Sequence, residues 1–273
     1  MDKHPKHSPI AQFLGRLTLI ALVPFTPGSV QAEADEAMDI LLGMTDFLAG
    51  QPHFSVAVQS SYDAVQADGQ KIEFAERRRL LLARPDRLRV DLEESDGLRH
   101  QLIYNGHQIS LATPQSHVYA QVSQPGTVDD AVRFFIRDLD MRLPFAVLLV
   151  SNASEELQRR TRQIDYVEQT HLAGVTVHHI AGRTDSVDYQ VWVRDGDTPL
   201  PVRLVLTYPD AEGQPQFRAD FRDWDLKPAL PDDAFVFTPP ADARQIPFAS
   251  ELPGSVAPAV APPSSDAPAG EQP

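Results

Sequence analysis

Most of the chain between residues 53 and 226 alternates apolar with polar residues, and this pattern limits the available folds more than any other feature. One segment carries apolar residues at every second position: Val187, Tyr189, Val191 and Val193. Such alternation predicts strands with one buried and one wet face. About eleven such segments follow one another without the strand–helix–strand repetition of a parallel sheet. The sequence therefore predicts an α+β fold, mainly β: one strongly curved antiparallel sheet of about eleven strands with helices on one face.

Two dipeptides predict tight turns between neighbouring strands. Asp68-Gly69 precedes the segment 70–84, and Asn105-Gly106 joins 99–104 to 107–112. Asn-Gly and Asp-Gly are the residue pairs that two-residue hairpin turns prefer. Strands that are neighbours in the sequence are therefore expected to be neighbours in the sheet.

Helical periodicity appears in three places. Before the first strand, apolar residues recur at spacings of three and four: Ala37, Ile40, Leu41, Met44, Phe47 and Leu48. A second apolar stripe, over 128–139, follows Thr127, with Asp130 at capping-box spacing. Pro144 is well placed to begin a short helix over Phe145–Val150. Because that segment is apolar almost all round, it requires a cover of sheet, partner or ligand.

The two ends of the chain differ from its middle. Residues 1–32 contain a basic stretch, a short apolar run and small residues up to Ala32, the order of a cleaved signal peptide. The alternative is a membrane anchor, but the apolar run is well short of the roughly 20 residues that a spanning helix needs. The expected organisation is a signal peptide over 1–32, one domain over 33–248 and a disordered Pro/Ala-rich tail over 249–273, with no integral membrane segment in the mature chain.

The absence of cysteine and the acidic balance exclude several classes of protein. Without cysteine the chain has no disulfides, no thiolate metal sites and no lipidation at a signal-peptide cysteine. The formal charge is −14, and removing residues 1–32, which carry a net +2, leaves −16. An acidic surface repels phosphate backbones, so nucleic acid is not an expected partner.

Residues with catalytic chemistry do not form a known motif. There is no G-x-S-x-G, P-loop or H-E-x-x-H sequence. His178 and His179, near His171, are adjacent on a predicted strand and so point to opposite faces. Asp195-Gly196-Asp197 is interpreted as a turn, because it lacks the further acidic ligands of a calcium loop. The prediction is a protein that is not an enzyme, with no catalytic residues, metal or cofactor.

Three motifs in order resemble the bacterial outer-membrane lipoprotein carriers, the LolA/LolB-like proteins. They are Ala83-Arg84-Pro85-Asp86-Arg87-Leu88-Arg89-Val90, Pro144-Phe145-Ala146-Val147-Leu148-Leu149, and Phe235-Val236-Phe237-Thr238-Pro239-Pro240-Ala241. The resemblance spans roughly residues 36–248 and is closest to DUF2092-like predicted periplasmic proteins. It implies a periplasmic protein with an incomplete barrel of about eleven antiparallel strands and a lid of helices over an apolar cavity.

The resemblance also implies ligands and a site. In the carriers the cavity holds acyl chains of lipoproteins, and an arginine near the lid is important for opening; its counterpart here is Arg84. A strand-end salt bridge is the alternative role for Arg84. The expected ligand-binding residues are Arg84, Phe135, Phe145, Leu148, Leu149, Trp192 and Phe221. These apolar residues could equally fill a closed core.

Two functional hypotheses follow. The first is a soluble periplasmic binding or shuttle protein for acyl chains, lipid or lipoprotein. The second is a non-enzymatic sensor or scaffold that binds an envelope protein, similar to periplasmic regulators that bind anti-sigma factors.

Overall fold

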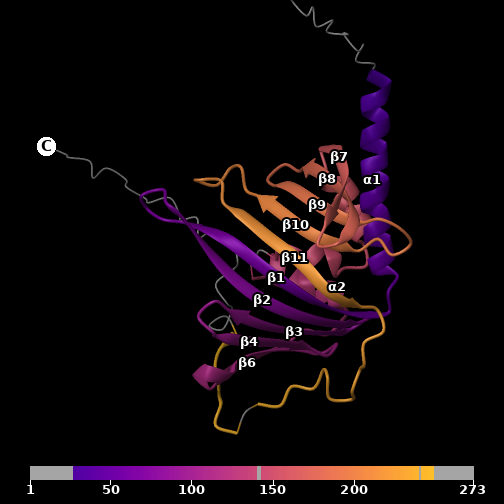
Figure 1. Ribbon diagram of the computed structural model, residues 1–273. Coiled ribbons are helices and arrows are strands. Elements are labelled where there is room, and N and C mark those ends of the chain that lie inside the picture. The colour runs from indigo at the N-terminus through magenta and orange to yellow at the C-terminus, as the bar shows by residue number, and fades with distance from the viewer. Residues whose placement is uncertain (1–26, 140–142, 240, 249–273) are drawn as a thin grey trace, which may run out of the picture.

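One large sheet organises the protein (Figure 1). The computed structural model describes residues 27–139, 143–239 and 241–248. Its twelve strands follow the order β12-β6-β5-β4-β3-β2-β1-β11-β10-β9-β8-β7, and every pair is antiparallel except β12 with β6. The predicted fold class is therefore confirmed, with one short strand more than the eleven expected.

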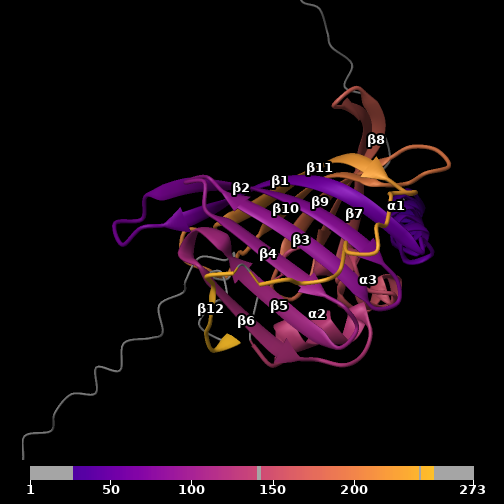
Figure 2. The same cartoon turned by 90° about the horizontal axis from the view of Figure 1, so that it is seen from below.

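The strands have the following bounds: β1 His53–Val65, β2 Lys71–Ala83, β3 Arg87–Glu94, β4 Arg99–Tyr104, β5 Gln108–Thr113, β6 Val118–Ser123, β7 Gln163–Leu172, β8 Val175–Arg183, β9 Asp188–Arg194, β10 Pro201–Thr207, β11 Gln216–Asp225 and β12 Arg244–Gln245. The helices are α1 Pro27–Ala49, α2 Val128–Arg137 and α3 Ala153–Arg160, with short 3-10 turns η1 Pro114–Ser116 and η2 Ala146–Leu148. The sheet curves around the helices, which lie on one side of it (Figure 2). We call that side the inner face.

Glycines at the predicted turns set the hairpins. Gly69 has φ +85° between β1 and β2, and Gly106 has φ +86° between β4 and β5. A Cβ on Gly106 would lie 2.5 Å from the Asp86 Oδ2 atom, so only glycine fits there. Both predicted turns are confirmed, and β1 and β2 pair along their full length, from His53 with Ala83 to Val65 with Lys71.

Helix α1 confirms the first predicted amphipathic helix. Its apolar stripe buries Ala37, Leu41, Met44 and Leu48 in the main core, and the helix contacts β7, β8 and β9. Helix α2 confirms the second: Thr127 Oγ1 accepts a hydrogen bond from the Asp130 backbone N–H, and the Asp130 carboxylate accepts one from the Thr127 N–H at 2.9 Å. The capping box fixes where α2 begins.

The predicted helix over Phe145–Val150 is wrong. The structure has only the 3-10 turn η2 there, because side chains from elsewhere bind the backbone that would continue a helix. Arg84 Nη1 donates to the Leu149 carbonyl at 3.0 Å, and the Ser151 N–H donates to Asp129 Oδ1 at 3.0 Å. An unpredicted helix, α3, follows immediately.

Phe235 and Phe237 of the third family-like motif lie on the outer face of the sheet. Ala234 and Phe235 are buried against Ile103, and Phe237 packs near Tyr119 with 5.6 Å between ring centroids. The chain then reaches β12, and Phe248 contacts Phe134 and Phe135 of α2. Residues 234–237 therefore lie outside the sheet, whereas Phe248 lies against a helix on the inner side.

The terminal predictions concern residues that the structure mostly leaves undescribed. Residues 1–26 of the predicted signal peptide and the tail over 249–273 lie outside the described residues, and the predicted cleavage point after Ala32 falls within α1. Within the described ranges, no helix combines the length and apolar character needed to cross a membrane.

Candidate ligand-binding cavity

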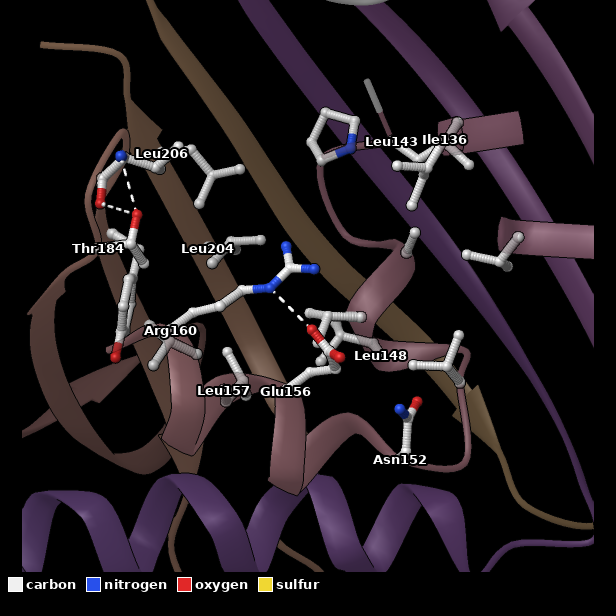
Figure 3. Close-up of a pocket in the computed structure, with 18 of the residues that line it drawn as sticks. Ile136, Leu143, Leu148, Asn152, Glu156, Leu157, Arg160, Thr184, Leu204 and Leu206 are labelled. Atoms are coloured by element: carbon white, nitrogen blue, oxygen red, sulfur yellow. Dashed lines mark hydrogen bonds and ion pairs between the residues drawn. The ribbon is translucent and has the colours of Figure 1, made fainter. Parts of the chain in front are cut away.

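A cavity of about 510 Å³ lies between the inner face and the helices that cover it (Figure 3). The strands β9 and β10 form one wall with Tyr189, Val191, Leu204 and Leu206. Helix α1 adds Leu41 and Met44, and the segment around η2 adds further apolar side chains, Leu148 among them. The volume falls within the 300–1,000 Å³ that is usual for small-molecule sites.

The alternation seen in the sequence explains the apolar wall. Pairing sets Tyr189 opposite Leu206 and Val191 opposite Leu204, so these four side chains share one face of the sheet. Their polar neighbours in sequence point to the outer face. A strand pattern with period two therefore produces a continuous apolar surface under the segment 143–160, which contains η2 and α3 and which we call the lid.

Polar residues cluster at the mouth of the cavity. From α3, Glu156 accepts hydrogen bonds from Arg159 Nη2 at 2.6 Å and Arg160 Nε at 2.8 Å. Burial raises the pKa of Glu156, but these hydrogen bonds and the two positive charges outweigh it, so the pKa lies below its usual value. Arg133 and Arg137 of α2 also line the cavity. The mouth is thus charged while the interior is apolar.

The lid is attached to the rest of the molecule by a few polar contacts. Besides the Arg84 bond to Leu149, Ser151 Oγ donates to Asp129, and Thr45 Oγ1 of α1 lies 2.7 Å from Ser154 Oγ of α3. Burial lowers the pKa of Arg84, and the charge of Asp129 opposes that shift. Arg84 Nε and Nη2 are buried and have no hydrogen-bond partner among the described residues.

Of the seven residues expected to bind ligand, only Leu148 lines this cavity. Leu149 and Phe145 belong to the lid but pack into the core, where the Phe145 ring contacts Phe217 and Phe221 with centroids 6.1 and 5.9 Å away. Phe135 is buried in the same core beside Phe248. Arg84 donates a hydrogen bond to the lid at Leu149 and does not line the cavity. The cavity is therefore bordered by the β9–β10 wall and not by these rings, and ligand binding by the seven residues stays a prediction.

Trp192 lies on the opposite face of the sheet. It pairs with His179 and Arg203 across the neighbouring strands, stacking on His179 with 4.1 Å between centroids and lying 5.8 Å from the Arg203 guanidinium. Since Val191 faces the cavity, its neighbour Trp192 must face outward. The sequence prediction included Trp192 among the apolar residues and did not assign it to a face of the sheet.

The two adjacent histidines point to opposite faces, as predicted. His178 Nδ1 lies 3.0 Å from the Tyr166 hydroxyl and its Nε2 lies 3.1 Å from Asp195 Oδ1, whereas His179 stacks on Trp192. No group of three histidine, aspartate or glutamate residues with metal-binding geometry occurs in the part of the chain that the structure describes.

Sequence reasoning missed α3 and its arginines, although the signal was present. The segment Ala153–Arg160 has acidic residues in its first turn and arginines in its last, the distribution that the helix dipole favours. It lacks an apolar stripe, since Ala153 is its one buried residue. A search for apolar periodicity alone therefore passes over it.

A family model described as "Predicted periplasmic protein (DUF2092)" matches residues 37–249. The chain belongs to this family. That membership confirms the resemblance drawn from the three motifs and the periplasmic location predicted from the sequence. No curated protein matches the chain.

Solved structures similar to this DUF2092 protein share little sequence with it. An uncharacterized conserved protein from Thermus thermophilus is 10% identical, with a TM-score of 0.45, over 78% of this chain and 99% of that one. The LolA superfamily protein NE2245 from Nitrosomonas europaea is 12% identical, with a TM-score of 0.37, over 74% and 97%. A chain in the structure of the MucA/MucB complex from Pseudomonas aeruginosa is 17% identical, with a TM-score of 0.39. The match covers 74% of this chain and 61% of that one.

Proposed function

We propose that this DUF2092 protein is a non-enzymatic periplasmic binding protein that shelters the hydrophobic chain of an acyl-bearing ligand, a lipid or a lipoprotein, and releases it when the lid moves. The cavity between the β9–β10 wall and the lid is the observation that carries the proposal. Its walls are apolar, and its volume suits a chain rather than a folded partner.

Burial of alkyl groups would supply the binding energy. Each methylene removed from water contributes about 0.8 kcal/mol, so ten of them contribute roughly 8 kcal/mol before the cost of association is subtracted. Tyr189, Val191, Leu204 and Leu206 offer that chain a continuous apolar surface. An apolar chain has no directional requirements, which suits a protein that must also release it.

The lid contacts suit repeated opening. The η2 segment is held by hydrogen bonds from Arg84 and to Asp129, groups that water can replace when the segment moves. Arg84 keeps two further N–H-bearing nitrogens without a partner among the described residues, so it has donors for another lid carbonyl. Opening would therefore exchange these polar contacts, unpack lid side chains such as Leu149 from the core and expose the cavity.

Native mass spectrometry of the mature protein purified from a bacterial envelope tests the proposal. We expect a population that carries one bound mass of acyl-chain size, and delipidated protein that binds one equivalent of a fluorescent fatty acid. Protein that carries no bound mass and takes up no probe after delipidation would contradict the proposal. One stoichiometric protein partner without lipid would favour the sensor or scaffold hypothesis instead.

A further inference from the structure

Arg160 extends from the last turn of α3 across the cavity (Figure 3). Its Nε donates to Glu156 Oε2 at 2.8 Å, while its two terminal nitrogens point away from that carboxylate toward the space in front of Leu204. The side chain is 64% exposed, so this guanidinium stands at the mouth, in contact with water. A guanidinium has five N–H donors in a planar fork, and most of those on Arg160 remain available.

The charges around the mouth favour an anion at this fork. Glu156 is shared by two arginines, Arg159 and Arg160, which leaves one positive charge in excess at that point. The other carboxylates that line the cavity are engaged elsewhere: Asp129 by Ser151, and Asp185 by two hydrogen bonds from Arg162 at 2.8 and 2.7 Å. Acidic groups at the rim are therefore satisfied, whereas Arg160 has donors to spare.

Helix α2 supplies two more arginines to the same lining. Arg133 Nη1 binds Asp130 at 2.6 Å, and Arg137 makes no ion pair with any residue that the structure describes. The chain as a whole carries −14, so it has no general attraction for anions. An anion that binds here must be held by local contacts.

The cavity volume limits the rest of the ligand. Its volume of about 510 Å³ lies in the range of 300–1,000 Å³ that is usual for sites that hold one small molecule. A site of this size suits one alkyl chain better than the several chains of a mature lipoprotein. An amphiphile with one alkyl chain would place that chain in the cavity and its polar end group near Arg160.

We propose that this cavity takes a single-chain amphiphile with an anionic end group, a carboxylate or a phosphate, and that Arg160 binds that group at the mouth. This proposal rests on the proposed function, because it requires the chain to occupy the cavity. Bidentate pairing of a guanidinium with a carboxylate or phosphate is the geometry that Arg160 offers.

Isothermal titration of the delipidated mature protein with three ligands of equal chain length tests the proposal. Palmitate carries a carboxylate, 1-palmitoyl-glycerol 3-phosphate carries a phosphate, and hexadecanol carries neither. The matched variants are Arg160→Gln and Arg159→Gln. Both remove one arginine from Glu156 and the two side chains are similarly exposed, at 64% and 61%, but Arg159 does not line the cavity.

We expect at least one anionic ligand to bind wild type about tenfold or more tightly than hexadecanol, the size of a charge-assisted hydrogen bond. Arg160→Gln should remove that preference and leave hexadecanol binding unchanged, while Arg159→Gln should keep it. The ligand that binds more tightly shows whether the preferred end group is a carboxylate or a phosphate. Equal affinity for all three ligands in wild type, or a preference that survives Arg160→Gln, would overturn the proposal and leave the proposed function standing. Binding of none of the three would instead contradict the proposed function.

Discussion

The inner face of the sheet has two halves that the same alternation pattern builds in different ways. In the cavity half, β9 and β10 present aliphatic side chains and one tyrosine to a space under the lid. The solid half is formed by β1 to β5, and strand β2 carries a buried ion pair there. Arg78 lies 2.5 Å from Glu76, and the two side chains are only 11% and 4% exposed. Ser60 Oγ also donates to Glu76, at 2.8 Å.

The lid itself marks the boundary between the halves. Phe145 packs on Phe217 and Phe221, and the Arg78 guanidinium lies 5.3 Å from its ring centroid. On that side, aromatic rings and the ion pair fill the space between the sheet and the lid. On the β9–β10 side, no aromatic ring from the described part of the lid packs against the sheet in the same way. The comparison teaches that the covering side chains, and not the strand pattern, decide whether part of a half-barrel is filled or hollow.

Breaking the ion pair should have the largest effect on the solid half. Arg78→Met leaves the Glu76 carboxylate buried without its cation, and loss of one partner of a buried pair costs about 3–5 kcal/mol. Urea unfolding measures this as a lower midpoint. The double variant Glu76→Gln with Arg78→Met should recover part of the loss, since it removes the buried charge. A single variant as stable as wild type would show that the pair lies in water.

Equivalent truncations in the two halves should differ. Leu80 is 2% exposed in the solid half, and Leu80→Ala should cost about 2–5 kcal/mol through the cavity that it creates. Leu204→Ala should cost less, because Leu204 borders the cavity and is only partly buried. Unfolding of both variants in urea provides the comparison. Equal losses would mean that the cavity half is as well packed as the solid half.

The buried hydroxyl of Tyr104, in the solid half, should make the stability of the protein depend on pH in the alkaline range. Burial, followed by the charges of Asp130 and Asp86, raises the pKa of Tyr104 to about 12. The unfolded chain loses this proton near pH 10 and the folded protein does not, so wild type loses stability as the pH rises from about 10 toward 12. The hydroxyl has no partner among the described residues, so Tyr104→Phe should be within about 1 kcal/mol of wild type at pH 7. Its alkaline loss, measured by thermal unfolding, should be smaller than that of wild type; an identical pH profile would contradict this assignment.

The smallest effect is expected outside both halves. Trp192→Phe keeps a ring against His179 on the outer face and should change stability by about 1 kcal/mol or less. Ligand affinity should stay within about twofold of wild type, because Trp192 faces away from the cavity. A large loss of fatty-acid binding in this variant would place the site on the other face.

The sequence was sufficient for the architecture because the architecture rests on local signals. Alternation set the strands, Gly69 and Gly106 set the turns, and Thr127 with Asp130 set the start of α2. Each of these features depends on neighbours within a few residues, so each could be predicted without coordinates.

The site could be predicted only in part because it depends on distant contacts. The lid was identified from its apolar run, but its form as a 3-10 turn depends on Arg84 and Asp129, which come from other elements. Trp192 and Phe221 were both predicted as apolar ligand-binding residues, yet Trp192 faces outward and Phe221 fills the core. Which apolar residues border an empty volume is a property of the whole packing and has no signature in the pattern of one strand.

Filling the cavity tests the central claim most directly. Leu157 of α3 and Leu204 of β10 both line the space, and the double variant Leu157→Trp with Leu204→Trp would occupy it from the two sides. Thr207→Trp, on the same strand but the opposite face, is the control. Palmitate titration should give one site in wild type and in the control, and none in the double variant, with similar melting temperatures for all three proteins. One site of unchanged affinity in the folded double variant would contradict the account.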